Sequence, residues 1–211
     1  MTDTSSGAPG TTSLAGDLQR YLQQGRDTMV AKLDGLGEHD VRRPLVPSGT
    51  NLLGLVKHLA GLELGYLGEC VGRPSGIVLP WVEDGSIWDD GDMWATPDEI
   101  EAVEAELDKT RADLVDLYRT AWRHADESIA RLPLDAPAEV PWWPEDRRAT
   151  TFGSLLVRMV AETAQHAGHA DILRETVDGS SGAGPGDPGD AETRAGHVGR
   201  IQAAADAFAR G

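Results

Sequence analysis

Apolar residues recur at three- and four-residue intervals along most of this chain, which is the periodicity of helices with one buried face. The first such segment covers about residues 14–35, and the second covers about residues 51–72. The longest segment runs from about 96 to 132, and a fourth runs from about 151 to 178. No convincing strand alternation or internal repeat accompanies them. The pattern therefore predicts an all-α fold in which four main helices pack as a bundle with long loops.

Residues with capping side chains mark the starts of three of these segments. Thr50 or Asn51 can cap the second helix, and Thr150 or Thr151 can cap the fourth. Thr96-Pro97-Asp98-Glu99 is a capping box with proline at the first helical position, so it can open the longest helix. These signals favour helices that begin where the apolar periodicity begins.

Glycine and proline divide the chain into regions. We expect a disordered lead at residues 1–11, the helical bundle at 12–178 and a flexible Gly/Pro-rich linker at 179–190. Residues 191–211 predict a short additional C-terminal helix that packs on the bundle. Residues 73–95 lose the helical period, carry several tryptophans and acids, and predict a long loop over the domain.

Composition narrows the classes of function. The chain has 211 residues and a net charge of −16, so its surface repels phosphate backbones and anionic lipid, and we expect neither nucleic-acid nor membrane binding. A small-molecule or protein partner is left, and a homodimer is favoured because bundles with exposed apolar faces often pair. The single cysteine, Cys70, fits a reducing compartment, and no signal-peptide pattern precedes the first helix, so a cytoplasmic protein is expected.

The fourth helical segment carries three side chains that can bind metals. Glu162, His166 and His169 stand at i, i+4 and i+7, so they project from one side of the helix. Burying a carboxylate and two imidazoles without partners costs several kcal/mol, and a divalent metal would compensate that cost. The same side also carries apolar residues that predict a face directed at the core, namely Leu155, Met159 and Leu173.

The second helical segment offers a further ligand. His58 shares a stripe with Leu55 and Leu62, which predicts that its side chain is buried. A lone histidine in such a position is more often a hydrogen-bonded core residue than a metal ligand. The presence of Glu162 and His166 four residues apart on another interior face favours the metal-binding interpretation for all three residues.

The predicted ligand set is His58, Glu162 and His166. Three protein ligands with positions left open describe a catalytic divalent site better than a closed structural one. Zinc is the default, and nickel, iron and manganese remain alternatives because this donor set does not select sharply among them. His169 could replace Glu162 as a ligand, since i, i+3 neighbours also converge. A supporting role beside the ligands, or contact with bound substrate, is about as well supported for His169.

The loop before the ligand helix has two interpretations. Trp142 and Trp143 precede Arg147 and Arg148, so aromatic rings and guanidinium groups could overhang the metal and bind an acidic substrate. The alternative, which we favour, is that the tryptophans anchor the loop on the bundle and the arginines are solvated surface charges.

The residues around both histidine segments resemble the DinB/YfiT-like superfamily of helical bundles. The similar stretches are Thr50-Asn-Leu-Leu-Gly-Leu-Val-Lys-His58-Leu-Ala and Glu162-Thr-Ala-Gln-His166-Ala-Gly-His169-Ala-Asp-Ile-Leu-Arg-Glu175. In that superfamily a histidine on the second helix joins two ligands four residues apart on a later helix, so the resemblance implies that His58, Glu162 and His166 bind metal. Many members have histidine where this chain has Glu162. Glutamate there looks like the mycothiol-dependent maleylpyruvate isomerase branch, and the stretches are also similar to an actinobacterial group.

This resemblance implies a metal-dependent thiol S-transferase or a thiol-dependent isomerase. The expected partners are a low-molecular-weight thiol such as mycothiol and an electrophilic small molecule. A bound metal would lower the pKa of the thiol, as it does for bound water, and the thiolate would attack an electrophilic carbon. Two alternatives stay open: a metal-dependent hydrolase that uses bound water, and a non-catalytic metal- or ligand-binding module.

Overall fold

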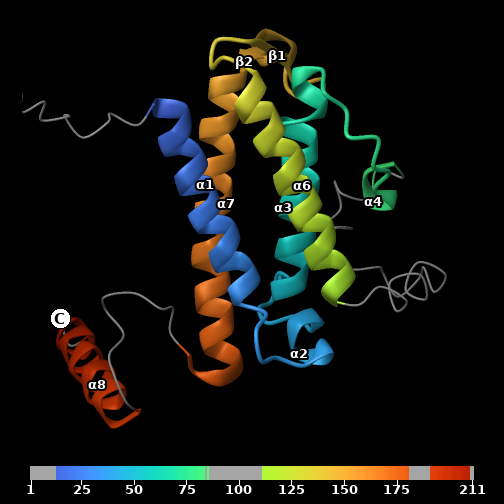
Figure 1. Cartoon of the computed structure of the whole chain (residues 1–211). Helices are drawn as coiled ribbons and strands as arrows, with labels where there is room; N and C mark the ends of the chain where they lie inside the picture. Colours follow the sequence, from blue (N-terminus) through green and yellow to red (C-terminus); the bar gives the residue numbers. More distant parts are fainter. Residues whose placement is uncertain (1–12, 84, 86–110, 181–190, 210–211) are drawn as a thin grey trace, which may run out of the picture.

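Four long helices form the body of the protein in this computed structural model, which describes residues 13–83, 85, 111–180 and 191–209. As Figure 1 shows, the four helices lie side by side along most of their length. The predicted all-α bundle is confirmed. Its helices are α1 (Leu14–Ala31), α3 (Leu52–Tyr66), α6 (Arg111–Arg131) and α7 (Phe152–Asp178).

The bundle consists of two pairs of helices. α1 packs along α7, and α3 packs along α6. Within each pair the two helices run in the same direction, and the two pairs run in opposite directions (Figure 1). α3 also packs against α7, and this contact brings the two predicted ligand helices together.

Caps at the helix starts agree with the predictions for α3 and α7. The side-chain oxygen of Asn51 accepts a hydrogen bond from the backbone N–H of Gly54 at 2.7 Å, and the Thr151 hydroxyl accepts one from Ser154 N–H at 3.3 Å. α7 ends before Gly179, whose φ of +75° stops the helix in the left-handed conformation that glycine adopts readily. The capping box at 96–99 lies outside the described residues.

α3 ends earlier than the predicted end near residue 72. The chain turns at Gly68, where a Cβ atom would stand 2.3 Å from the carbonyl oxygen of Leu64, so only glycine fits. A 3₁₀ turn, η1 (Glu69–Val71), follows. Two short helices also lie outside the four predicted helical segments, namely α2 (Glu38–Arg42) and α4 (Pro80–Glu83).

A small sheet corrects the expectation that the chain has no strands. β1 (Pro137–Glu139) pairs with β2 (Ala149–Thr151) in antiparallel fashion, with Ala138 opposite Thr150. Between them lies the 3₁₀ turn η3 (Glu145–Arg147). Strands of three residues are too short for a period of two to appear in the sequence. The hairpin covers one end of the bundle (Figure 1).

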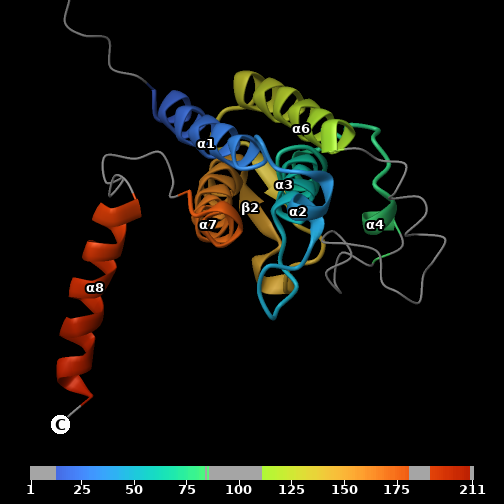
Figure 2. The same ribbon diagram turned by 90° about the horizontal axis from the view of Figure 1, so that it is seen from below.

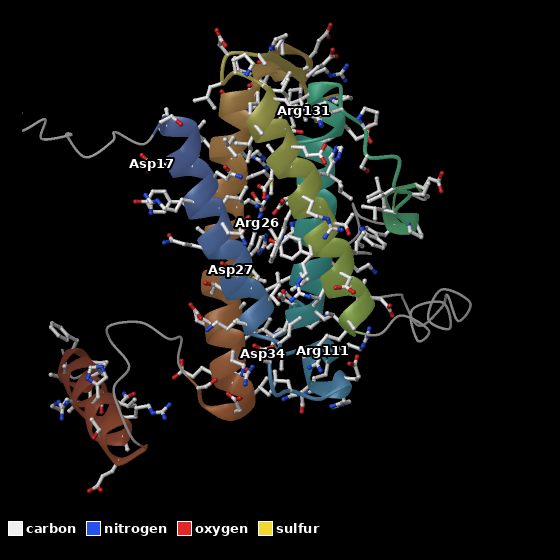
Figure 3. All side chains as sticks on the ribbon, viewed as in Figure 1. Asp17, Arg26, Asp27, Asp34, Arg111 and Arg131 are labelled. Carbon is white, nitrogen blue, oxygen red and sulfur yellow. The ribbon has the colours of Figure 1, made fainter. Side chains whose placement is uncertain are left out.

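Two clusters of buried apolar side chains fill the bundle, one nearer each end. Between the helices lies a charged pair, Arg26 of α1 and Glu63 of α3, and both side chains are fully buried. Figure 3 shows Arg26 among the helices rather than on the outer surface. The interior therefore joins α1 to α3 through charge as well as through apolar packing.

α8 (Ala191–Phe208) forms the predicted C-terminal helix. Its described side chains are almost all exposed, and both views draw it apart from the bundle (Figures 1 and 2). The expectation that this helix packs on the bundle stays a prediction. None of the helices in the described part of the chain is both long and apolar enough to span a membrane.

Candidate metal centre

The packing of α3 against α7 brings His58, Glu162 and His166 together. One ligand atom from each residue lies within 4.8 Å of the other two. Glu162 and His166 are neighbours because they stand one turn apart on α7, and His58 reaches them from α3. The structure thus places the three predicted ligands at one point on the seam between two helices.

The spacing of the ligand atoms suits a single ion. His166 Nε2 lies 3.3 Å from Glu162 Oε1, and His58 Nε2 lies 3.9 Å from the same oxygen. Ligands held about 2.1 Å from a tetrahedral zinc ion stand about 3.4 Å from one another. The two imidazole rings meet edge to face, with centroids 5.0 Å apart. Two nitrogens and a carboxylate oxygen at these distances fit a divalent cation.

The site lies at the edge of the bundle and is open to solvent. The side chains of His58, Glu162 and His166 keep 21%, 24% and 14% of their exposure. The prediction that His58 is buried is therefore wrong, because its ring lies where the α3–α7 seam meets solvent. A small molecule can therefore reach the three side chains from solvent.

The electrostatics of His166 favour its neutral form. Burial lowers the pKa of this imidazole, the nearby His58 lowers it further, and the Glu162 carboxylate acts in the opposite direction. Its Nδ1 is buried and has no hydrogen-bond partner among the described residues, whereas its Nε2 faces Glu162. A neutral imidazole with Nε2 directed into the group is the form that binds metals.

His169 lies beside the group rather than within it. Its ring centroid is 5.4 Å from that of His166, and its side chain is exposed. Within the described part of the chain, the cluster of close ligand atoms contains His58, Glu162 and His166 without His169. The structure thus places His169 next to a candidate ligand, at the border with solvent.

The loop that carries Trp142 and Trp143 is anchored on the bundle. The indole N–H of Trp142 donates to the Tyr66 hydroxyl at 3.3 Å, and Trp143 is half-buried against the apolar cluster at that end. Arg147 and Arg148 are exposed, and Arg148 donates to the Trp143 carbonyl within its own loop. These positions agree with the anchoring interpretation of the two tryptophans.

Arg158 lies beside the site, and the sequence analysis did not predict it there. It lies one turn before Glu162 on α7, with its Nη2 3.8 Å from Glu162 Oε2. Its guanidinium lies over the rings of Tyr66 and Trp143, at 5.0 and 5.5 Å from their centroids. The i, i+4 spacing of Arg158 and Glu162 was the available sequence signal, but the contact with the two rings depends on tertiary packing.

A comparison with known families matches most of the chain. A family model described as Mycothiol-S-transferase matches residues 17–179. The matched stretch begins in α1 and ends with α7, so it contains all three residues of the candidate metal centre. No curated protein matches the chain.

Proposed function

The chain belongs to the mycothiol-S-transferase family, within the DinB/YfiT-like superfamily, and from this premise we propose that it is a metal-dependent enzyme. Its proposed reaction joins the sulfur of mycothiol, or of a closely similar thiol, to an electrophilic carbon of a small molecule. The observation that carries the metal dependence is the grouping of His58, Glu162 and His166 within 4.8 Å.

The proposed metal is a divalent ion, and zinc is the first choice. Two neutral imidazoles and one carboxylate supply three ligands, which leaves at least one position for a thiol or water. Nickel, iron and manganese accept the same donors, so the choice among them depends on availability as well as on this site. His58 Nε2, His166 Nε2 and Glu162 Oε1 are the atoms assigned to hold the ion.

The proposed chemistry is the activation of the thiol. A bound divalent ion would lower the pKa of a thiol so that a thiolate is present at neutral pH. The lowered pKa of His166 favours the form that binds without first losing a proton, and the partial exposure of the three side chains lets the thiol proton leave to solvent. The thiolate then forms a carbon–sulfur bond with the electrophile, whose leaving group departs with its electron pair.

The test is thiol-dependent turnover. Purified full-length protein is stripped with a chelator, reloaded with zinc, and assayed with mycothiol and an activated aryl chloride, with the thioether adduct measured by mass spectrometry. We expect turnover in the zinc-loaded wild type and its loss in Glu162→Gln. Glu175→Gln, an exposed position on the same helix, is the matched control and should retain activity.

The outcomes separate the three functions considered from the sequence. Product that forms equally well without thiol would point to a hydrolase that uses water. Bound metal with no adduct from any electrophile tested would point to a non-catalytic module. Adduct formation that survives the removal of metal would contradict the proposed mechanism.

A further inference from the structure

Arg158 is held in place while its hydrogen-bonding groups stay available. Its guanidinium lies over the Tyr66 and Trp143 rings, which restricts its motion. The nearest acidic oxygen, Glu162 Oε2, is 3.8 Å away, which is beyond hydrogen-bond distance. The guanidinium forms no hydrogen bond with any other described residue, and 43% of the side chain is exposed. The N–H donors of Arg158 therefore face a region that a ligand can enter.

The Glu162 carboxylate divides this region into two sides. Its Oε1 is the oxygen nearest His58 and His166, and its Oε2 is the oxygen nearest Arg158. The candidate metal position and the guanidinium are thus neighbours separated by one carboxylate. A small molecule bound beside Glu162 can place one group against Arg158 and another at the metal centre.

The charge of the occupied site indicates what that molecule carries. With neutral imidazoles, the charges of Glu162 and Arg158 cancel, so a divalent ion would leave the site with a charge of about +2. A bound thiolate would lower this charge by one. A second anion would neutralise the remainder, and a partly desolvated site favours neutrality.

We propose that Arg158 binds the carboxylate of the electrophile, so that the enzyme selects acidic electrophiles. This inference rests on the proposed transferase function and names the substrate class for the same site. The planar guanidinium matches a carboxylate through two parallel hydrogen bonds, and the stacked rings preorganise it for that contact. The proposed role is specificity for the electrophile rather than attachment of the metal.

The test compares two electrophiles of similar size, one with a carboxylate and the other with a neutral amide at the same ring position. In both 4-chloro-3-nitrobenzoate and 4-chloro-3-nitrobenzamide, the thiolate sulfur forms a bond to the aryl carbon and chloride leaves with its electron pair. Each kcat/KM is divided by the rate constant of the uncatalysed reaction with mycothiol, because the amide activates the ring more than the carboxylate does. With zinc-loaded wild type, we expect this normalised value to be about tenfold or more higher for the benzoate, as a charged hydrogen bond implies. The zinc content of each variant is measured in parallel.

The variants isolate Arg158. Arg158→Gln should lower kcat/KM for the benzoate by about 10- to 100-fold, mainly through KM, and should change the value for the benzamide by less than about twofold. Arg158→Lys should restore part of the preference because the charge remains without the planar fork. Arg131→Gln, at an exposed position on α6, is the control and should retain the wild-type preference.

Three results would overturn the inference. Equal normalised kcat/KM values for both compounds in the wild type would refute the carboxylate preference and leave the transferase function intact. Loss of zinc in Arg158→Gln, with both rates falling together, would show that Arg158 merely positions Glu162. No adduct from either compound in the zinc-loaded wild type would reject the transferase function and the inference with it.

Discussion

The buried pair of Arg26 and Glu63 joins α1 to the helix that carries His58, and its removal should destabilise the whole bundle. Arg26 Nε donates to Glu63 Oε1 at 2.9 Å, and its Nη2 donates to Oε2 at 2.6 Å. Both side chains are fully buried. Arg26 Nη1 also donates to Asp126 Oδ1 at 2.9 Å, and the Asp126 side chain is 36% exposed. The arginine therefore has two acidic partners, one of them in contact with solvent.

This geometry predicts unequal effects of removing either partner. Removing one partner of a buried ion pair lowers the free energy of unfolding by about 3–5 kcal/mol. The cost of Glu63→Gln should be near the lower end of this range, about 3 kcal/mol, because Arg26 keeps Asp126 as a counter-charge. The cost of Arg26→Met should be near the upper end, about 5 kcal/mol, because Glu63 is then left buried without its cation. Replacing both together, as Arg26→Met with Glu63→Leu, should cost much less than the sum.

The assay is urea unfolding followed by circular dichroism at 222 nm, with the free energy of unfolding compared at equal m-values. The dependence on pH provides a second measurement. Burial raises the pKa of Glu63, and Arg26 opposes that rise. In Arg26→Met the folded-state pKa should rise further above the unfolded value. The stability of this variant is then greatest below the unfolded pKa and falls as pH rises through the folded pKa, so its deficit should grow between about pH 5 and 8.

Equal costs for the two single variants, costs below about 1 kcal/mol, or additive costs in the double variant would refute this reasoning. A deficit in Arg26→Met that does not change with pH would refute the part that concerns the unpaired carboxylate.

Three further predictions concern other parts of the chain. Burial, and secondarily Glu69, raises the pKa of Cys70 to about 12, so Ellman's reagent at pH 8 should leave this thiol unmodified in folded protein and titrate it in urea; rapid modification of the folded protein would contradict this. His169→Ala should retain bound zinc by elemental analysis, since His169 lies outside the ligand group; loss of zinc would make it a ligand. If α8 packs on the bundle with Ile201 against the exposed face of α7, Ala164→Cys and Ile201→Cys should form a disulfide within one chain on a Cys70→Ala background, seen by gel mobility without reductant. A disulfide between chains would place α8 on a partner, and the absence of any disulfide would contradict packing that brings these two positions together.

The features predicted correctly from the sequence are those that depend on local chemistry and on helical periodicity. The caps at Asn51 and Thr151 depend on side chains within three residues of the N–H groups that they satisfy. The approach of His58 to Glu162 and His166 follows from the polar residues that interrupt apolar stripes on two helices, because two helices that share a core turn these stripes toward each other.

The features that were missed depend on how distant segments meet. The exposure of His58 depends on where the α3–α7 seam meets solvent, which the stripe on α3 does not encode. The position of Arg158 depends on Tyr66 and on the loop that carries Trp143. The end of α3 is set by the close approach of Gly68 to the Leu64 carbonyl, although a glycine at that point was visible in the sequence.

The central claim is that His58, Glu162 and His166 hold one divalent metal ion, and elemental analysis tests it most directly. Untagged protein is purified without chelator, and its metal content is compared with that of His58→Ala, Glu162→Gln and the control Glu175→Gln. We predict about one zinc, nickel, iron or manganese ion per chain in the wild type and the control, and loss of the metal in both site variants. Wild-type protein that binds no metal even after reconstitution, or site variants that keep it, would contradict the claim.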